Sequence, residues 1–560
     1  MHPLLEGNNT KKFLLGNEAI VRGALESGVK VGSAYPGTPS SEIGNHLFKI
    51  QEELPGLYFE FAVNEKVAME IVGAASACGL RSLTCMKHVG LNVASDALMT
   101  LAYVGVKGGL VIVTADDPFC HSSQNEQDNR YYARLAQLPL LEAYSPQSAY
   151  ELTKFAFELS EKLEIPVILR TTTRVSHARG IVEVGEIPQE IYLKFDKGFF
   201  EKNPFRYVPI PAVARERHKI LLQKLKEAQE IAEVFKQNQM VIKGKMGICA
   251  SGVAINYVLD AIEDLGVAEE VSLLLLTFTH PFPEKLIKEF LSQVESCLVV
   301  EELEPYLEEG LRITAYNYGI KTKILGKREN YFPRYFEFST FQVKKAIAEF
   351  LKREIHLEIP PFDFSNKLPP RPPVLCPGCP HRETYKIIKE VLQDLKEEEN
   401  TIYPTDIGCY TLGILPPLKM ADYLLCMGSS VGTSCGFEVA TSQKVIAFIG
   451  DSTFFHTGLS PLVNAKYNDH HFILVVLDND TTAMTGHQPV PSQILKAPSL
   501  KDKPTISIKK IAEALEIPCV EINPYKKEEA KNLIRPFLEN KKLSVIIAKA
   551  PCILYKSKFK

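Results

Sequence analysis

IGDSTFFHTG (449–458) and VVLDNDTTAMTGHQ (475–488) are the two stretches that decide the fold. In each, apolar and β-branched residues typical of a buried strand give way to polar residues, which include Asp451 in the first stretch and Asn479 in the second. These two residues are 28 positions apart, a spacing that fits one β-α-β unit of a parallel sheet. We therefore expect both side chains at the same edge of neighbouring strands.

This pair has the composition of a magnesium and diphosphate site. Mg²⁺ prefers octahedral oxygen ligands and is usually held by one or two protein oxygens together with substrate phosphates. The predicted ligands are the Asp451 carboxylate, the Asn479 amide oxygen and the Thr481 carbonyl, and Gly450 would let the backbone approach the phosphates closely. The alternative is that Asp451 only caps a helix, the commonest role of an aspartate at such a turn. The second polar pair at crossover distance favours the metal site.

Similar apolar runs recur along the whole chain and alternate with amphipathic helical stretches. They are LVIVTA (110–115), IPVILR (165–170), VSLLLLT (271–277), SCLVVEE (296–302), KVIAFIGD (444–451), FILVVLDN (472–479) and SVIIAKA (544–550). Continuous runs of this kind are typical of parallel strands buried on both faces, so the sequence predicts an α/β protein built from open parallel sheets. Ligands of such sheets bind at the carboxyl ends of strands, where Asp451 and Asn479 are expected.

Two breaks in this alternation divide the chain. Residues 191–239 lack strand-like runs and end in a charged helical stretch, which we interpret as a solvated connector. Eight prolines between positions 360 and 380 exclude a helix interior or a central strand and indicate an extended linker, placed at 356–370. The predicted domains are 1–190, 240–355 and 371–560.

The composition is that of an ordinary globular protein. The 560 residues are 45% hydrophobic and 23% charged, and the formal net charge is −3. This balance gives no reason to expect nucleic acid or an anionic membrane as a partner. No apolar run approaches the ~18 residues of a membrane span, and the N-terminal residues do not read as a secretory signal. We expect a cytoplasmic, multidomain protein whose twelve cysteines are thiols or metal ligands rather than disulfides.

The segment around Asp451 resembles the thiamine diphosphate motif, in which Gly-Asp is followed at this distance by Asn. GDSTFFHTG is similar in particular to the large subunits of the indolepyruvate:ferredoxin oxidoreductase family, which carry serine at the position of Ser452. The resemblance continues, in collinear order, through six further segments. These are GNEAIVRGALESGV (16–29), YPGTPSSEI (35–43), NEKVAMEIVGAASACG (64–79), MKHVGLNVASDALM (86–99), CPGCPHR (376–382) and AKAPC (548–552). It implies pyrimidine-binding, transketolase C-terminal-like and diphosphate-binding domains in that order, with Gly428 among the cofactor-binding residues.

By this resemblance, Glu65 is the acid that hydrogen-bonds the aminopyrimidine of thiamine diphosphate, so that the cofactor can remove its own C2 proton. Glu65 lies in FEFAVNEKVAMEIVGAASA (59–77), where an extended segment gives way to a helix start. The alternative is a glutamate favoured at a helix N-terminus by the helix macrodipole. The resemblance favours the catalytic role.

Two further segments are predicted to line the substrate cavity. Thr38 lies in the turn YPGTPSS and resembles the family threonine that meets the 2-oxoacid. Lys87 and His88 follow the short strand SLTCM, where a cation or an imidazole could meet a carboxylate. A hydrogen-bonded interior histidine is an equally good interpretation of His88. The polar segment 114–130 either gates the site or is only a surface loop.

Four cysteines make up the last candidate site. Cys376 and Cys379, spaced as C-x-x-C, fit a zinc pair, a redox dithiol or an iron–sulfur pair, and the flanking prolines argue against a thioredoxin-like helix start. Cys409 and Cys552 close strand-like runs in the same predicted domain, so four thiolates can converge beside the diphosphate end of the cofactor. Four thiolates match a [4Fe–4S] cluster and also match, position by position, the cluster ligands of the 2-oxoacid:ferredoxin oxidoreductases. The alternative is a structural Cys₄ zinc site, which predicts a colourless protein.

The resemblance implies a ferredoxin-dependent oxidative decarboxylation of 2-oxoacids, with arylpyruvates such as indolepyruvate as the leading substrates, to acyl-CoA and CO₂. It also implies a smaller second subunit, ferredoxin and coenzyme A as partners. Only eight residues follow Cys552, so we expect the family's ferredoxin-like tail to be absent and electrons to leave through an external carrier or a separate subunit. Two alternatives remain, a non-oxidative thiamine decarboxylase, which needs no thiolates, and a non-catalytic zinc-bearing scaffold.

Overall fold

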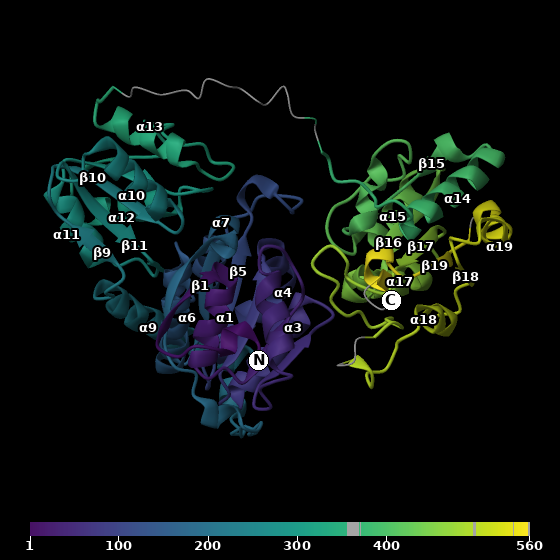
Figure 1. Cartoon of the computed structure of the whole chain (residues 1–560), viewed down its shortest axis with the longest axis horizontal. Coiled ribbons are helices and arrows are strands. Elements are labelled where there is room, and N and C mark those ends of the chain that lie inside the picture. Colours follow the sequence, from purple (N-terminus) through teal and green to yellow (C-terminus); the bar gives the residue numbers. More distant parts are fainter. Residues whose placement is uncertain (355–368, 370, 497–499, 541, 558–560) are drawn as a thin grey trace. The chain divides into compact units, whose positions relative to one another are not determined.

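The computed structural model describes residues 1–354, 369, 371–496, 500–540 and 542–557. The chain divides into two compact units, Met1–Ile359 and Pro360–Lys560. Figure 1 colours the first unit from purple to teal and the second from green to yellow. The division falls in the stretch predicted as a proline-rich linker (356–370), of which only Pro369 belongs to the described residues.

The first unit contains a seven-stranded sheet with the order β12-β6-β7-β5-β4-β2-β3. Strands β5 and β7 are buried along their whole length, as their continuous apolar runs predict, and every pair is parallel except β12 with β6. The strands are β2 (Val31–Ala34), β3 (Tyr58–Phe61), β4 (Ser82–Lys87), β5 (Leu110–Asp116), β6 (Leu140–Glu142), β7 (Val167–Thr172) and β12 (Phe278–His280). The carboxyl ends of β2, β3, β4 and β5 share one edge, and the segments carrying Thr38, Glu65 and His88 follow these ends directly.

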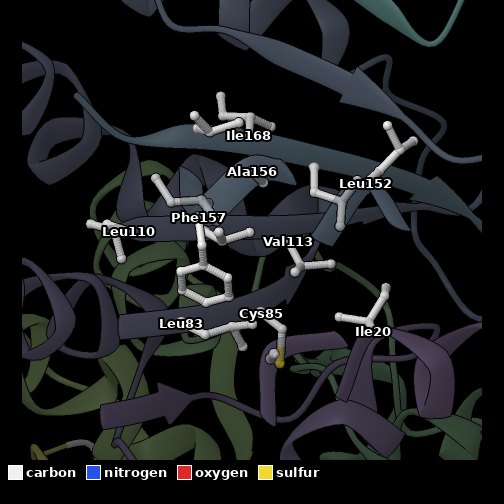
Figure 2. Packing of buried hydrophobic residues seen from close by; sticks show 14 of the residues in the cluster. Ile20, Leu83, Cys85, Leu110, Val113, Leu152, Ala156, Phe157 and Ile168 are labelled. Atoms are coloured by element: carbon white, nitrogen blue, oxygen red, sulfur yellow. The ribbon is translucent and has the colours of Figure 1, made fainter. Parts of the chain in front are cut away.

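Helices pack on this sheet and enclose an apolar core. Figure 2 shows part of this core, where Ala156 and Phe157 of α6 lie among strand residues that include Leu83, Leu110 and Ile168. The helices are α1 (Gly16–Glu26), α2 (Ser41–Ile50), α3 (Glu65–Ala77), α4 (His88–Val104), α5 (Arg130–Ala136), α6 (Pro146–Leu163), α7 (Thr173–His177) and α8 (Pro204–Tyr207). Two further strands, β1 (Thr10–Leu15) and β8 (Arg179–Val184), pair as an antiparallel ribbon.

A second sheet of the first unit has the order β14-β13-β10-β11-β9 and is parallel except for β9. Its strands are β9 (Gln239–Val241), β10 (Met246–Ser251), β11 (Val271–Leu276), β13 (Ser296–Val300) and β14 (Lys323–Leu325). Its helices are α10 (Ala254–Leu265), α11 (Glu284–Gln293), α12 (Tyr306–Asn317) and α13 (Thr340–Phe350).

The two sheets of the first unit are joined by more than the intervening chain. Strand β12, from the predicted middle domain, extends the first sheet by pairing with β6. The buried Arg130 guanidinium binds Asp128 at 2.6 Å from its own segment and Glu301 at 2.7 Å from beyond β13. Helix α9 (Pro211–Glu233), predicted as a solvated connector, buries Leu221, Ala228 and Ala232 in the core of the first sheet. The stretch 191–239 therefore contributes packing as well as a connection.

The second unit is a five-stranded, fully parallel sheet with the order β15-β16-β17-β19-β18. Its strands are β15 (Thr401–Ile402), β16 (Lys444–Gly450), β17 (Ile473–Asp478), β18 (Cys519–Ile522) and β19 (Ser544–Lys549). Its helices are α14 (Pro380–Asp394), α15 (Ser429–Ala440), α16 (Asp451–Thr453), α17 (Leu459–Tyr467), α18 (Ile508–Ala514), α19 (Lys527–Glu539) and α20 (Ile553–Lys556), with a π-helical turn at Phe454–Gly458. The predicted α/β class with open, mainly parallel sheets is confirmed. Throughout the described residues, every helix is too short or too polar to cross a lipid bilayer.

Candidate active site

Asp451 and Asn479 lie at the carboxyl ends of two neighbouring parallel strands, the arrangement that their spacing predicts. Gly450 at the end of β16 is opposite Leu477 near the end of β17. Asp451 is almost fully buried, and its two carboxylate oxygens accept hydrogen bonds from the backbone N–H groups of Ser452 (2.8 Å) and Asp480 (3.0 Å). The carboxylate therefore connects the two strand ends directly.

Negative charge accumulates at this edge of the sheet. Burial, together with the neighbouring charge of Asp478, raises the pKa of Asp451 well above its ordinary value, and burial also raises the pKa of Asp480. Lys549 lies 3.4 Å from Asp478 and offsets part of this charge. A divalent cation would relieve the remainder, and the carboxylate, amide and carbonyl oxygens of Asp451, Asn479 and the buried Thr481 are ligands of the kind that Mg²⁺ prefers. The donor set thus fits the predicted metal.

Asn479 links this edge to two of the predicted cysteine segments. Its backbone carbonyl accepts a hydrogen bond from the N–H of Cys552 at 2.8 Å. Its side-chain nitrogen Nδ2 lies 3.2 Å from Nε2 of the buried His381, two residues after Cys379. An amide nitrogen can only donate, so His381 accepts, and burial lowers the pKa of His381 to about 4, which keeps the ring neutral. His381 therefore fixes the orientation of the Asn479 amide group.

The four predicted cysteines lie near one another in the second unit. Burial, together with the charges of Cys379, Cys552 and Cys376, raises the pKa of Cys409 to about 12. Burial is also the main reason that the pKa of Cys379 is raised, with smaller contributions from Cys376 and Cys552. All twelve cysteines are free thiols. The four thiols are thus within electrostatic range of one another.

Across the residues that the structure describes, no three His, Cys, Asp or Glu side chains converge closely enough to hold one metal ion. Two of the three oxygens proposed as Mg²⁺ ligands come from an asparagine amide and a backbone carbonyl, which are not side chains of those four residue types. A [4Fe–4S] cube spreads its four thiolates over a larger span than a single ion does.

Gly450 and Ser452 flank the aspartate. A Cβ atom at Gly450 would lie 2.6 Å from the ring of Tyr410, so the absence of a side chain there makes room for Tyr410. The Tyr410 hydroxyl is 3.2 Å from Thr453 and 3.1 Å from the carbonyl of Ile407, which it meets as a donor. The Ser452 hydroxyl accepts a hydrogen bond from the Thr482 hydroxyl at 3.1 Å. Tight packing in the protein therefore accounts for Gly450, in addition to any phosphate contact.

Gly428 caps the start of α15 in a left-handed conformation with φ +86°. Its N–H donates to one oxygen of Asp406 (2.6 Å), and the N–H of Ser430 donates to the other (3.0 Å). A Cβ atom at Gly428 would lie 1.8 Å from the Thr457 hydroxyl. The role of Gly428 in this structure is therefore to let the turn pass close to Thr457, since its N–H is already bound.

In the first unit, Glu65 begins α3 and is almost fully buried. The preceding Asn64 caps this helix by accepting a hydrogen bond from the N–H of Val67 at 2.9 Å. A Cβ atom at Gly90 of α4 would lie 2.6 Å from Oε1 of Glu65. The Glu65 carboxyl group therefore rests against the backbone of α4 at a position where only glycine leaves room.

Thr38 and Lys87 are brought together by the loop that follows β5. The Ser122 hydroxyl donates to the carbonyl of Thr38 (3.3 Å), and Lys87 Nζ donates to the carbonyl of Ser122 (2.8 Å). Burial lowers the pKa of Lys87, while the negative charges of Asp117 and Glu65 oppose that shift, which places Lys87 within electrostatic range of Glu65. The loop thus covers the edge where the predicted substrate residues lie.

His88 is completely buried beneath the same loop. Its Nε2 lies 3.0 Å from the carbonyl of Asn125, which can only accept, so Nε2 carries the proton. Burial lowers the pKa of His88 to about 4. These are the properties of the interior, hydrogen-bonded histidine that the sequence left open, and they assign His88 to holding the loop.

Sequence reasoning missed Asp406, His381 and Gly90. Asp406 follows the apolar stretch around β15, so the rule that located Asp451, a polar residue after a strand, also applies to it. His381 was visible only as part of CPGCPHR, and Gly90 gave no signal, because its importance depends on Glu65 from another helix.

Two family models match the chain. "Pyruvate flavodoxin/ferredoxin oxidoreductase, thiamine diP-bdg" matches residues 22–242, and "Thiamine pyrophosphate enzyme, C-terminal TPP binding domain" matches residues 406–548. Among solved structures, a 2-oxoglutarate:ferredoxin oxidoreductase from Magnetococcus marinus has a TM-score of 0.50 at 16% identity, covering 61% of this chain and 66% of that one, which is a likeness of fold alone.

Curated relatives are similar over almost the whole chain. "Indolepyruvate oxidoreductase subunit IorA" of Methanothermobacter marburgensis is 50% identical over 98% of this chain and 88% of its own length. The proteins of the same name from Archaeoglobus fulgidus and Pyrococcus abyssi are 42% and 45% identical, covering 98% and 97% of this chain and 88% and 86% of their own lengths. The chain therefore belongs to the IorA family of indolepyruvate oxidoreductase subunits, within the thiamine diphosphate-dependent 2-oxoacid:ferredoxin oxidoreductase superfamily.

Proposed function

We propose that the chain catalyses the ferredoxin-linked oxidative decarboxylation of arylpyruvates such as indolepyruvate. In this reaction the bond between the carboxylate and keto carbons breaks, CO₂ leaves, and the acyl carbon forms a thioester with coenzyme A. The thiol releases one proton, and two electrons pass singly to ferredoxin. The product is an acyl-CoA.

One observation carries this proposal. The strand end that bears Asp451 and Asn479 is hydrogen-bonded to the Cys552 backbone and to His381 of the C-x-x-C segment. Asn479, a proposed metal ligand, is therefore hydrogen-bonded to the segments that carry two of the four proposed cluster ligands, Cys379 and Cys552. A non-oxidative thiamine enzyme has no use for such thiolates, and a zinc scaffold has no use for the buried carboxylates.

In the second unit, Asp451, Asn479 and the Thr481 carbonyl would hold Mg²⁺ and, through it, the diphosphate. Cys376, Cys379, Cys409 and Cys552 would hold the cluster, which four thiolates can ligate. Thiamine diphosphate and the cluster supply, when bound, the electron sink for carbon–carbon bond cleavage and a route for single electrons.

In the first unit, the Glu65 carboxyl group would hold a proton at the aminopyrimidine nitrogen, since it is buried and kept in place by Gly90. Thr38 and the Lys87 ammonium would bind the keto and carboxylate oxygens of the 2-oxoacid. His88 would act indirectly, by fixing the loop that contacts both residues.

The names of the relatives mark them as subunits, and we propose a smaller second subunit for this chain as well. Coenzyme A and ferredoxin complete the proposed partners. Electrons would reach ferredoxin from the cluster directly or through a further subunit.

The test is to purify the chain anaerobically with its second subunit and to record the visible spectrum before and after dithionite. Indolepyruvate-dependent reduction of a viologen dye, with and without coenzyme A, is then measured on the same sample. A brown protein that bleaches and reduces the dye supports the proposal. A colourless protein that binds thiamine diphosphate and releases CO₂ supports a non-oxidative decarboxylase, and a zinc-bearing protein that binds no thiamine supports the scaffold.

A further inference from the structure

Two phenylalanines stand exposed at the edge of the first unit where Thr38 and Lys87 lie. Phe119, in the loop after β5, has 50% of its side chain exposed, and Phe336, in the segment before α13, has 44%. Their ring centroids are 4.7 Å apart with an interplanar angle of 57°. Adjacent exposed apolar side chains can form a binding surface, whereas singly scattered ones are normal. We call Phe119 and Phe336 the aromatic pair.

The aromatic pair is held in place by unusual backbone geometry. Both residues have positive φ angles, 74° for Phe119 and 64° for Phe336, a region that bulky side chains rarely adopt. One carboxylate oxygen, Oε1 of Glu126, accepts the N–H of Phe119 at 2.7 Å and the N–H of Phe336 at 2.8 Å. A single acceptor therefore fixes two loops from different sheets in strained conformations. Such strain typically persists where the side chain has a function.

The aromatic pair is continuous with the proposed substrate residues. The loop that carries Phe119 also carries Ser122, which bonds both Thr38 and Lys87. On its other side, His121 lies 3.2 Å from Glu337, the neighbour of Phe336. Thr38 and Lys87, which would bind the keto and carboxylate groups of a 2-oxoacid, are thus hydrogen-bonded to the loop that carries Phe119.

We propose that Phe119 and Phe336 form the subsite for the planar aromatic side chain of the substrate, with Glu126 as a positioning residue. This inference rests on the proposed function and adds the residues that select the substrate. Aromatic rings bind one another in stacked or edge-to-face arrangements, which an aliphatic 2-oxoacid cannot match. The preference for arylpyruvates would therefore reside in two loops, apart from the residues that perform the chemistry.

The first test compares Phe119→Ala and Phe336→Ala in the complete complex. For each, kcat/KM is measured for indolepyruvate and for an aliphatic 2-oxoacid, and the ratio of the two values is the readout. We expect this ratio to fall about 10- to 100-fold, mainly through KM for the aromatic substrate. Phe341→Ala is the matched control, because Phe341 is 53% exposed but does not belong to the pair, and its ratio should equal that of the wild type.

Variants of Glu126 test whether this residue acts by positioning the two rings that would contact the substrate. Glu126→Ala should lower the ratio as the ring variants do, whereas Glu126→Gln keeps an oxygen acceptor and should restore most of the preference. An unchanged ratio in both ring variants, with turnover intact, would show the proposal to be wrong and leave the proposed function standing.

A binding measurement decides the case even if no 2-oxoacid is turned over. The chain contains no tryptophan, so the fluorescence of an indole ligand, excited where tyrosine does not absorb, reports the ligand alone. Indole-3-lactate, which lacks the keto group, is titrated with the full chain and with each variant. We expect the ring variants to bind it at least 10-fold more weakly. Equal binding by wild type, ring variants and the Phe341→Ala control would overturn the subsite, while loss of turnover alone would count only against the proposed function.

Discussion

The position of the buried Glu65 side chain depends on the space left by Gly90, which has no Cβ atom, in the neighbouring helix α4. We expect Glu65→Gln to lower turnover of the 2-oxoacid by about 10²–10⁴, because an amide cannot hold and return a proton at the pyrimidine nitrogen. Affinity for thiamine diphosphate, measured by calorimetry, should change little, since the diphosphate residues are in the second unit. Turnover close to that of the wild type would remove Glu65 from the mechanism.

Gly90 offers an independent test of the same geometry. In Gly90→Ala the new methyl group would meet Glu65 Oε1 at 2.6 Å, so the carboxyl group must move. A displacement of this size typically lowers kcat by about 10²-fold. Gly436→Ala is the control, because a Cβ atom at that helical glycine meets nothing within 4 Å. Equal turnover in both variants would show that the position of the Glu65 carboxyl group is not critical.

At the scale of elements, the contact between the two sheets of the first unit should make stability depend on pH. Burial raises the pKa of Glu302 to about 7, with Glu337 adding to the shift and Arg170 and Lys327 opposing it. The native protein thus holds this proton more tightly than the unfolded chain, so the stability it contributes is complete below about pH 4.5 and is lost as the pH rises through about 7.

The melting temperature of the first unit should therefore fall between pH 5 and pH 8, followed by calorimetry. Glu302→Gln removes this titratable group and should make the fall of the melting temperature with pH less steep. It should not abolish the fall, because burial raises the pKa of Glu301 to about 7 as well. Glu201→Gln, with its side chain 75% exposed, should leave the slope unchanged. A slope that is the same in all three proteins would contradict the assignment.

The elements differ in how visible they are in the sequence. The run FILVVLDN gives β17 because a strand buried on both faces must be apolar throughout. Strand β12 has only three residues, and its partner β6 lies more than 130 positions earlier, so no local pattern predicts it. The π-helical turn at Phe454–Gly458 contains Thr457, which lies against the distant Gly428, and hydrophobic periodicity likewise does not reveal this turn.

At the scale of the molecule, the candidate site was predictable where its residues follow strands or form spaced motifs. This holds for the placement of Asp451, Asn479 and the four cysteines, because each of them follows a strand-like run or belongs to a spaced motif. It fails for Asp406, His381 and Gly90, because their roles arise from contacts between segments far apart in the chain. The exposed aromatic pair also escapes notice, since an exposed phenylalanine has no pattern of its own.

Loading with thiamine diphosphate and Mg²⁺ should stabilise the whole protein. A ligand at about 100 times its Kd adds about 2.7 kcal/mol to the free energy of unfolding, which calorimetry detects as a rise in the melting temperature. Removal of Mg²⁺ with a chelator should reverse most of this gain, and Asp451→Ala should abolish it. A gain of the same size in Asp451→Ala would remove Asp451 from the metal site.

The two hydrogen bonds of Asn479 have a consequence for the protein in air. Dioxygen that damages the proposed iron–sulfur cluster would disturb Cys552 or the start of α14 at His381, and both are hydrogen-bonded to Asn479, the residue proposed to present an oxygen to the metal. We therefore expect aerial inactivation to reach the vitamin-derived coenzyme at the same time. Exposure to air should therefore abolish all turnover of the 2-oxoacid. The inactivated protein should not retain a non-oxidative activity that releases CO₂ and the aldehyde.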